Sequence, residues 1–363
     1  MEVLHFVPGS GVGGIERFVM DITSVKKKEI NYSFVVFARK DTDFIRCIKK
    51  RGSVYVFPGW TYTTIKEYFK LLKNKQYDVV HAHLGCWSFI VLGIAKQTGV
   101  KKRIAHSHSA DTFSNMNYVG KTIFCLSKIF NSFCITDYMA CSDHACKYTF
   151  GSNVMNTDKY TRILNPVDFN RIRFNEYFIE KELRNILGLR NSSKIVCNIG
   201  YLGKHKNQSF LLHIAERKEL SNVDFLLVGD GWNRTRLEKM INDKNLTNVH
   251  LVGVRNEISD ILKMSDIFVL PSILEGLGTV VLEAQACGTP CIISENVTIE
   301  TDMGLGLVQQ IPLLEEDAWV LAINTTEKKV FDYRTIIDAF SSRNVTIDKC
   351  ISLIESIYKG TKI

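Results

Sequence analysis

Short apolar runs rich in β-branched residues alternate along the chain with longer segments that place apolar residues at helical spacing. In the first half, the short runs predict strands at Val3–Val7, Ser33–Phe37, Val54–Phe57, Val79–Ala82, Arg103–His106 and Tyr138–Cys141. Helical patterns occupy intervals between them at Gly14–Lys27, Thr64–Lys73 and Trp87–Gln97. Strands that are apolar throughout and joined by helices are typical of a parallel sheet covered on both faces.

The same alternation starts again in the second half. The apolar runs predict strands at Ile195–Ile199, Phe225–Gly229, Val249–Val252, Ile267–Leu270 and Cys291–Ser294. Helices are expected near Gln208–Lys218, Arg234–Asn242, Ile258–Lys263 and Thr279–Cys287. Two successive β/α series indicate two doubly wound α/β domains, and a length of 363 residues suits two hydrophobic cores.

The boundary between the domains is predicted within Val167–Asn191, which is polar and charged and contains few β-branched residues. We therefore expect an N-terminal domain at 1–168 and a C-terminal domain at 169–363. The tail, Val345–Lys359, has apolar residues at helical spacing and predicts a final amphipathic helix that packs back on the N-terminal domain.

The apolar runs are too short to cross a bilayer, since the longest one lies within Cys86–Ala95. The N-terminus shows no signal-peptide pattern. The ten cysteines are scattered without a Cys-x-x-Cys pair, so no disulfide is expected. These features predict a cytoplasmic protein that is soluble or bound to the surface of a membrane.

The positive charge is concentrated in the first half of the chain. Residues 1–165 contain 23 Lys and Arg against 12 Asp and Glu, whereas the remainder contains 23 against 26. The basic half suits an anionic partner, for which nucleic acid, an anionic membrane and a phosphorylated acceptor are the candidates. Charge alone does not separate these three.

The segment Pro271–Pro290 carries the strongest chemical signal in the chain. A buried strand ends at Pro271, a loop with Gly276 and Gly278 follows, and a helix begins about Thr279. Glycines let the backbone approach a ligand, and the N–H groups of a helix start attract an anion. The segment therefore predicts a phosphate site.

Two glutamates accompany this predicted phosphate site. Glu275 precedes the glycine loop, and Glu283 follows one turn into the helix. Carboxylates repel a phosphate, so each glutamate is expected to serve another part of the ligand. Sugar hydroxyls are suitable partners because an ionised carboxylate only accepts hydrogen bonds.

The Glu-x7-Glu pattern followed by Ala-Cys-Gly-x-Pro resembles the signature of family 4 of the GT-B glycosyltransferases. Further segments follow that family's order along nearly the whole chain, at Gly11–Arg17, Asp78–His83, Arg103–His108, Asn165–Asp168, Gly229–Gly231, Gly253–Arg255 and Ser265–Ser272. The chain is most similar to bacterial capsule and exopolysaccharide transferases. The resemblance implies a GT-B fold of two Rossmann-like domains, with the donor in the cleft between them.

In the C-terminal domain the resemblance implies that Glu283 binds the donor ribose, Glu275 contacts the donor sugar and Lys206 neutralises the departing phosphate. Backbone groups of the glycine loop are expected to hold the diphosphate or sugar, namely those of Gly276, Leu277, Gly278 and Thr279.

In the N-terminal domain the resemblance implies that Gly13 and Gly14 let the backbone approach the donor diphosphate. His108 is the best match to the family's histidine near the reacting sugar, with His106 as the alternative. His81 and His83 are interpreted as histidines at a strand end whose ring nitrogens have partners within the protein.

The implied reaction is a retaining transfer from a nucleoside-diphosphate sugar, with UDP preferred, to a glycan or lipid-diphosphate-linked acceptor in surface polysaccharide synthesis. No metal, cofactor or nucleic acid is expected, while peripheral contact with an anionic membrane is. The Asp-x-Asp string at Asp41–Asp43 is interpreted as a loop. No residue stands out as a covalent nucleophile, which favours a front-face mechanism assisted by the leaving phosphate.

One position departs from the family pattern, because Tyr201 occupies the place of an arginine that pairs with the donor diphosphate. A neutral hydroxyl replaces a bidentate cation there. The diphosphate is then expected to rest on Lys206, helix N–H groups and either Lys204 or Arg255. The departure also leaves open a non-catalytic partner subunit.

Three further alternatives have other chemistry. A nucleotide-sugar epimerase or glycan phosphorylase would have the same architecture. A dinucleotide-dependent dehydrogenase is disfavoured, because the second predicted strand runs into Phe37–Lys40 and offers no carboxylate for a ribose.

Overall fold

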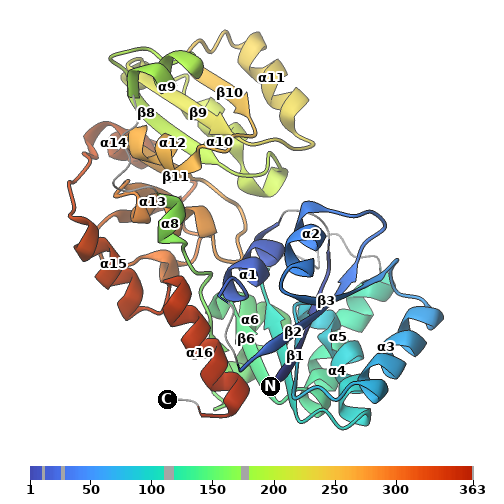
Figure 1. Ribbon diagram of the computed structural model, residues 1–363. Helices are drawn as coiled ribbons and strands as arrows, with labels where there is room; N and C mark the ends of the chain where they lie inside the picture. Colours follow the sequence, from blue (N-terminus) through green and yellow to red (C-terminus); the bar gives the residue numbers. More distant parts are fainter. Residues whose placement is uncertain (10–12, 26–28, 110–117, 173–179, 362–363) are drawn as a thin grey trace. The chain divides into compact units, whose positions relative to one another are not determined.

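The computed structural model describes residues 1–9, 13–25, 29–109, 118–172 and 180–361. The chain forms two compact units, shown in Figure 1. The first comprises Met1–Pro166 together with Ile347–Ile363, and the second comprises Val167–Thr346. The chain thus passes into the second unit at Val167, beside the boundary that the sequence predicts, and returns to the first unit for its C-terminal helix.

The described residues of the first unit form a seven-stranded sheet in the order β3-β2-β1-β4-β5-β6-β7. All neighbouring strands are parallel. The strands are β1 (Glu2–Val7), β2 (Asn31–Phe37), β3 (Gly52–Phe57), β4 (Val79–Ala82), β5 (Lys102–Ser107), β6 (Asp137–Ala140) and β7 (Tyr160–Arg162). The strand order reverses between β1 and β4, which is where ligands bind in doubly wound sheets.

The helices of this unit are α1 (Gly14–Ile22), α2 (Asp43–Lys49), α3 (Tyr62–Asn74), α4 (Ser88–Gln97), α5 (Tyr118–Cys134), α6 (Asp143–Phe150), α7 (Ser152–Met155) and α16 (Ile347–Lys359), with a 3-10 turn at Gly85–Trp87. The predicted amphipathic tail is α16. Its residues Cys350, Ile351, Ile354 and Ile357 are buried in the same hydrophobic cluster as Phe18 of α1.

The described residues of the second unit form a six-stranded sheet in the order β10-β9-β8-β11-β12-β13. Its strands are parallel and comprise β8 (Lys194–Ile199), β9 (Val223–Val228), β10 (Val249–Gly253), β11 (Ile267–Leu270), β12 (Cys291–Ser294) and β13 (Val308–Ile311). The order reverses between β8 and β11. This is the strand order of a Rossmann fold.

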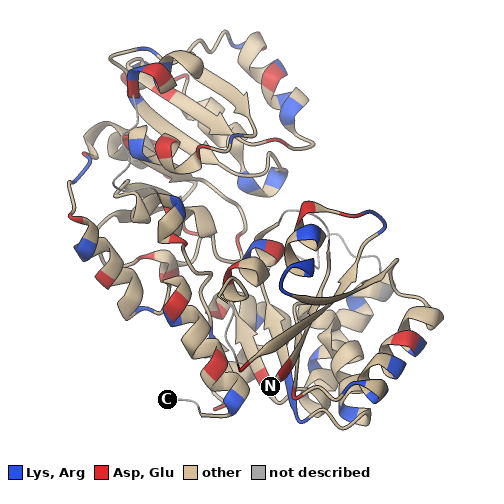
Figure 2. Ribbon diagram, in the orientation of Figure 1, with Lys and Arg blue, Asp and Glu red and all other residues tan. Residues whose placement is uncertain are grey.

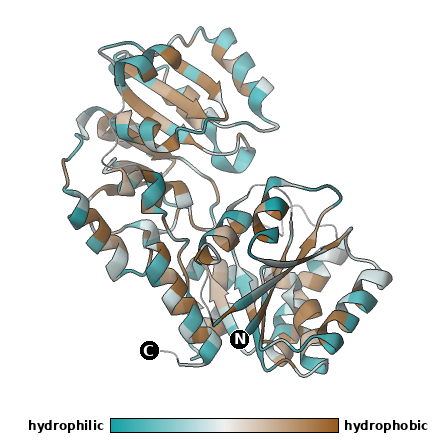
Figure 3. Cartoon of the chain, in the orientation of Figure 1, coloured by the Kyte–Doolittle hydropathy of each residue, from teal (hydrophilic) through white to brown (hydrophobic). Residues whose placement is uncertain are grey.

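The α-helices of the second unit are α8 (Phe169–Ile172), α9 (Glu180–Ile186), α10 (Gln208–Ile214), α11 (Arg234–Asp243), α12 (Ile258–Met264), α13 (Thr279–Ala286), α14 (Glu316–Thr325) and α15 (Tyr333–Ser342). Short 3-10 turns lie at Lys204–Lys206, Lys218–Leu220 and Ile299–Thr301. Trp319 and Phe225 are fully buried in the core of this unit. Figure 3 shows the hydrophobic residues of its strands as brown bands.

Every strand predicted from the sequence is present, and three of them have the predicted bounds: β4, β11 and β12. The edge strands β7 and β13 were missed, since both are short and partly exposed. The polar segment Val167–Asn191 contains α8 and α9, where Leu183 is buried, and belongs to the second unit. Short helices with one or two buried residues give little helical periodicity to detect.

Candidate active site

The point of strand-order reversal in the second unit brings two predicted site residues together. Lys206 lies in the 3-10 turn that follows β8, and Glu275 lies in the loop that follows the adjacent strand β11. Because the carboxyl ends of parallel strands meet at one edge of a sheet, residues separated by 69 positions become neighbours.

Lys206 and Glu275 form a close ion pair. The Lys206 Nζ atom lies 2.5 Å from Glu275 Oε1, and the two side chains are only 16% and 10% exposed. Ser272, which is buried, donates its hydroxyl to the same carboxylate oxygen at 2.8 Å. The backbone N–H of Ile273 donates to the carbonyl of His205 at 2.8 Å and joins the two loops. The pair is therefore held by its surroundings and faces little water.

The glycine loop enters α13 through a position that strongly favours glycine. Gly278 caps the helix in a left-handed conformation, with φ of +85°, and a Cβ there would lie 3.2 Å from side-chain atoms of Leu270 and Val297. The first turn of α13 thus begins directly at the carboxyl edge of the sheet. Glu283 lies one turn further along and is half-buried.

Tyr201, the departure from the family pattern, bridges two loops at this edge. Its side chain is half exposed, its ring stacks on His205 with centroids 6.4 Å apart, and its hydroxyl accepts a hydrogen bond from the Trp232 N–H at 3.4 Å. The loops that follow β8 and β9 lie in close contact at Gly200 and Gly229. A Cβ on Gly229 would lie only 2.0 Å from the carbonyl oxygen of Gly200.

The two cations expected to compensate for Tyr201 differ in their surroundings. Lys204 is exposed, two residues before Lys206. Arg255 follows the edge strand β10 and pairs with Glu257. Burial opposes ionisation of Glu257, yet hydrogen bonds from backbone N–H groups and from Arg255 hold its pKa below the ordinary value. The Arg255 guanidinium thus has the Glu257 carboxylate as its ion-pair partner.

In the first unit, the predicted glycines open α1 directly after the loop that follows β1. The Gly13 N–H donates to the buried carboxylate of Glu16 at 3.1 Å, and a Cβ on Gly13 would lie 2.8 Å from the same oxygen. A Cβ on Gly14 would meet nothing within 4 Å. Gly13 thus makes room for the capping glutamate, while Gly11 of the predicted glycine loop lies outside the described residues.

Five histidines, four of them buried and His108 half-buried, form a network along the strands that flank the reversal point of the first unit. His83 is central, since its ring lies 2.9 Å from His108 (Nδ1 to Nε2) and 3.0 Å from His5 (Nε2 to Nδ1). A second series joins His106 to His81 at 3.2 Å, and His81 Nδ1 to the hydroxyl of Tyr358 in α16 at 2.7 Å. The sequence had not indicated His5, which stands alone in an apolar strand.

Burial keeps these imidazoles neutral. Desolvation lowers the pKa of His5 and of His108 to about 3, and it lowers the pKa values of His81, His83 and His106 well below the ordinary value, with a further contribution from neighbouring histidines. His108 therefore offers a neutral ring at the carboxyl end of β5. Such a ring can donate or accept one hydrogen bond but carries no charge at pH 7.

The histidines also include the residues best suited to a metal. Among the described residues, the nitrogens of His5, His81 and His83 lie within 4.8 Å of one another, as do those of His83, His106 and His108. The ring-to-ring hydrogen bonds at 2.9 to 3.2 Å already satisfy several of these nitrogens without an ion. The expectation of metal-free chemistry stays a prediction.

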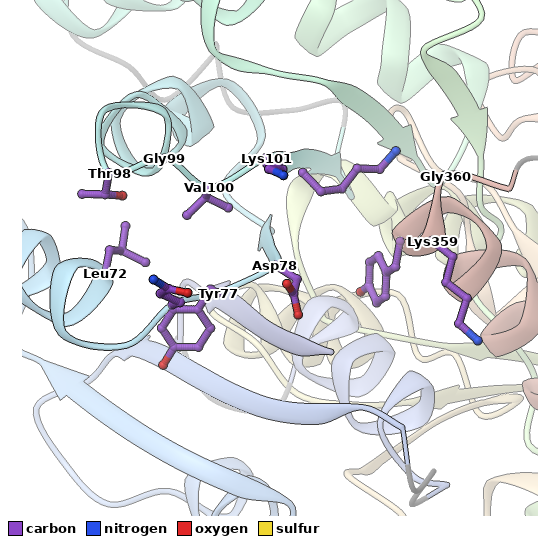
Figure 4. A pocket seen from close by; sticks show the side chains of 12 residues that line it. Leu72, Tyr77, Asp78, Thr98, Gly99, Val100, Lys101, Lys359 and Gly360 are labelled. Atoms are coloured by element: carbon purple, nitrogen blue, oxygen red, sulfur yellow. The ribbon is translucent and has the colours of Figure 1, made fainter.

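A separate cavity of about 580 Å³ lies at the amino ends of strands β4 and β5 in the first sheet, whereas the histidine network lies toward their carboxyl ends (Figure 4). It is lined by Tyr77 and Asp78 before β4, by Lys101 before β5, and by Tyr358 and Lys359 at the end of α16. Ligands of doubly wound sheets bind at the carboxyl ends of the strands, whereas this cavity lies at the amino ends. We assign it no part in the chemistry.

Comparison with known proteins agrees with the site in the second unit. Residues 179–303, which include Lys206, Glu275 and Glu283, match the family model described as glycosyl transferases group 1. The chain is related to the group 1 glycosyltransferases. The resemblance predicted from the sequence is thereby confirmed.

Glycosyltransferases similar to this chain match it over most of its length. The putative glycosyltransferase EpsF of Bacillus subtilis is 27% identical over 324 residues, which cover 86% of this chain and 84% of that protein. The UDP-Gal:alpha-D-GlcNAc-diphosphoundecaprenol alpha-1,3-galactosyltransferase of Escherichia coli is 29% identical over 276 residues, or 73% of this chain and 70% of that protein.

A solved structure extends the similarity of fold to nearly the whole chain. The crystal structure of HepE from Anabaena, in complex with UDP and glucose, superimposes with a TM-score of 0.78 at 18% identity and covers 98% of this chain and 99% of HepE. The predicted GT-B fold class is confirmed.

Proposed function

We propose that this glycosyltransferase transfers a sugar, with retention of configuration, from a nucleoside-diphosphate sugar to a lipid-linked or oligosaccharide acceptor in surface polysaccharide synthesis. The observation that carries the proposal is the Lys206–Glu275 pair at the strand-order reversal, beside the start of α13. A cation, a carboxylate and a helix N-terminus together can bind a phosphate and a sugar hydroxyl at adjacent points.

We assign each part of the donor molecule to different residues of this site. The Lys206 ammonium and the N–H groups at the start of α13 are assigned to the diphosphate, with backbone of Gly276–Thr279 close to it. Glu275 is assigned to hydroxyls of the donor sugar and Glu283 to the ribose. UDP is the preferred nucleotide, because HepE is described with UDP and the Escherichia coli relative is named for UDP-Gal.

The proposed chemistry depends on stabilising the departing diphosphate. Negative charge develops on its oxygens as the glycosidic bond breaks, and Lys206 with the helix N-terminus supplies fixed positive potential in a site with little water. We propose that this suffices without a metal ion and that the leaving phosphate guides the acceptor to the same face of the sugar. His108, as a neutral imidazole, is assigned to a hydrogen bond with the reacting sugar.

The proposed acceptor places the enzyme at the inner face of a membrane. The Escherichia coli relative is named for a diphosphoundecaprenol-linked substrate, and the first unit is strongly basic. We therefore propose a cytoplasmic protein in peripheral contact with anionic lipid.

Calorimetric titration with UDP, GDP and NAD, without added metal, tests the donor site. We expect UDP to bind, and Glu283→Ala to weaken its binding about 10-fold or more through loss of a charge-assisted hydrogen bond. Glu238→Ala is the matched control, since this glutamate lies in α11 and pairs with Arg234. Binding of NAD instead of UDP, or equal loss in both variants, would contradict the proposal.

Tyr201 supports one alternative, a non-catalytic partner subunit of the same fold. A transfer and hydrolysis assay with UDP-sugars separates the two functions. If the native chain binds UDP yet turns over no UDP-sugar, while Tyr201→Arg does, the partner role is favoured.

A further inference from the structure

The histidine network of the first unit contains more imidazoles than the proposed sugar transfer uses. That function gives His108 a hydrogen bond to the reacting sugar and assigns nothing to the other four rings. A buried polar group without a hydrogen bond costs free energy. Three ring nitrogens are nevertheless buried without a partner among the described residues, namely His5 Nε2, His106 Nε2 and His108 Nδ1. Hydrogen bonds within the protein therefore leave part of this network unexplained.

Three of these imidazoles lie close enough together to share one metal ion. One nitrogen from each of His83, His106 and His108 lies within 4.8 Å of the other two. His83 Nδ1 and His108 Nε2 are 2.9 Å apart, and the rings of His106 and His108 stack with centroids 4.0 Å apart. Two nitrogens on one tetrahedral Zn²⁺ are about 3.4 Å apart, so the closest pair has to open by only about 0.5 Å.

The hydrogen bonds of the network leave His106 with a lone pair for an ion. His106 Nδ1 lies 3.2 Å from His81 Nε2, and His81 Nδ1 lies 2.7 Å from the Tyr358 hydroxyl. When His81 donates from Nδ1 to Tyr358, its Nε2 accepts the proton of His106 Nδ1, and His106 Nε2 keeps its lone pair. Partners of this kind fix the tautomer of metal-binding histidines.

His5 orients His83 in the same way. His83 Nε2 lies 3.0 Å from His5 Nδ1 and can donate to it, which leaves the lone pair of His83 Nδ1 directed at His108. Without an ion, His108 Nε2 donates its proton to that lone pair. With an ion, this proton moves to His108 Nδ1, and the ring stays neutral. Metal binding thus gives up one hydrogen bond of the network and releases no net proton.

A second group of three nitrogens, from His5, His81 and His83, is less suited to an ion. Both nitrogens of His81 already have partners, which are Tyr358 and His106. All three rings of this group are buried, whereas His108 of the first group is half-buried. An ion therefore reaches the first group from the side of His108 without breaking a bond of His81.

The ligand set selects the kind of ion. Neither group of nitrogens includes a Cys, Asp or Glu. The charged residues of β1, β4 and β5 are Glu2, Lys102 and Arg103, all at the amino ends of their strands, and the rest of these strands is tan in Figure 2. Imidazole suits Zn²⁺ and the neighbouring transition metals, whereas Mg²⁺ and Ca²⁺ prefer oxygen ligands.

We propose that His83, His106 and His108 form a binding site for a divalent transition-metal ion such as Zn²⁺ at the carboxyl ends of β4 and β5. His5 and His81 are positioning residues, because each holds a ligand through its second nitrogen. A bound ion occupies His108, so it inhibits sugar transfer. This inhibition rests on the proposed function, whereas metal binding itself does not.

Calorimetric titration of the untagged full chain, after treatment with a chelator, tests the site. We expect one Zn²⁺ to bind, and Mg²⁺ to bind at least about 100-fold more weakly. His106→Asn should weaken Zn²⁺ binding about 10-fold or more, because the asparagine amide can still donate to His81 but nothing replaces Nε2. His108→Gln, at a half-buried position, should have the same effect, and circular dichroism checks that each variant is folded.

Matched controls address the other possible ligands of Zn²⁺. The His213 side chain is 57% exposed and lies beside Glu216 and Glu316. Cys47 and Cys125 are exposed thiols. His213→Asn, and the double variant Cys47→Ser, Cys125→Ser, should bind Zn²⁺ within about 2-fold of the native chain, as expected for surface substitutions away from the site.

A transfer assay with a UDP-sugar tests the inhibition. Zn²⁺ should lower the rate at concentrations near its measured Kd, and EDTA should restore it. Each variant is compared with its own rate without zinc. Transfer that is unchanged when Zn²⁺ saturates the site would contradict the inhibitory role.

Three outcomes of the titrations would overturn the metal site itself. They are equal loss of Zn²⁺ binding in His106→Asn and His213→Asn, equal binding of Zn²⁺ and Mg²⁺, and loss in His5→Asn with none in His106→Asn or His108→Gln. The last result would place the ion in the other group of nitrogens. If Zn²⁺ binds as expected but neither UDP binding nor transfer is found, the metal site stands and the proposed function fails.

Discussion

At the scale of single residues, the candidate site depends on one charged pair held in place by neutral neighbours. Lys206 and Glu275 are mostly buried, and Ser272 supports the carboxylate. A buried carboxylate that loses its cation is left with an unfavourable charge. The pair therefore contributes to the fold, and the proposed function assigns the same ammonium to the donor phosphate.

Replacing Lys206 by methionine tests its assignment to the donor diphosphate. We expect Lys206→Met to lower kcat for transfer from a UDP-sugar by about 100-fold to 1,000-fold, because one fixed electrostatic donor to the leaving group is lost. Lys204→Met is the control, as this lysine is exposed and two residues away. Steady-state kinetics measures both, and equal effects would remove Lys206 from its proposed role.

Backbone strain supplies a second prediction at the residue scale. Gly229 has a φ of +136°, and a Cβ there would lie 2.0 Å from the carbonyl oxygen of Gly200. Gly59 has a similar φ of +143° but open space around it. We expect Gly229→Ala to lower the free energy of unfolding by about 3 kcal/mol and Gly59→Ala by about 1 kcal/mol. Urea denaturation measures both, and equal losses would show that the close approach of the two loops is unimportant.

At the scale of secondary-structure elements, α16 connects the end of the chain to the histidine network. Ile351, Ile354 and Ile357 are buried beside α1, and Tyr358 reaches His81. The helix therefore contributes a polar partner to a buried imidazole as well as apolar surface.

Removing that hydroxyl should destabilise the first unit. Tyr358→Phe leaves His81 Nδ1 without its partner, so we expect the free energy of unfolding to fall by about 1 to 3 kcal/mol. Tyr62→Phe, at a residue that is 81% exposed, should change it by less than about 0.5 kcal/mol. Denaturant titration compares the two. Indistinguishable midpoints would mean that the His81–Tyr358 bond adds nothing to stability.

At the scale of the whole molecule, the two units differ in net charge and in their content of buried histidines. The first unit is basic and contains the histidine network, of which His5, His81, His83 and His106 are buried and His108 is half-buried, whereas the second unit is slightly acidic. Burial lowers the pKa of His5 and His108 from 6.5 to about 3. Protons therefore bind the unfolded chain in preference to the folded one between these values.

Stability should fall as the pH is lowered from about 6.5 toward 3. Since the folded pKa is depressed, each such histidine contributes stability that is complete above 6.5 and declines by about 1.4 kcal/mol per pH unit below it. We expect urea midpoints to be constant above about pH 6.5 and to decrease steadily as the pH falls below that value. The variant His5→Gln should have a shallower dependence, and an unchanged slope would contradict a neutral buried His5.

The sequence alone determined the two β/α series, most strand positions and the residues of the glycine-loop motif at Pro271–Pro290. Apolar runs and glycine loops are local sequence signals, so they can be recognised without knowledge of the tertiary contacts. The motif from Pro271 to Pro290 also indicated the family, which the comparison confirmed.

Only the tertiary structure decided which distant residues meet. The strand order makes neighbours of Lys206 and Glu275 and assembles His5, His81, His83, His106 and His108 into one network. It also returns α16 to the first unit and exposes the apolar side of α5. Periodicity shows that a helix has two faces, but only packing decides which face is buried, because burial depends on the neighbours that the fold supplies.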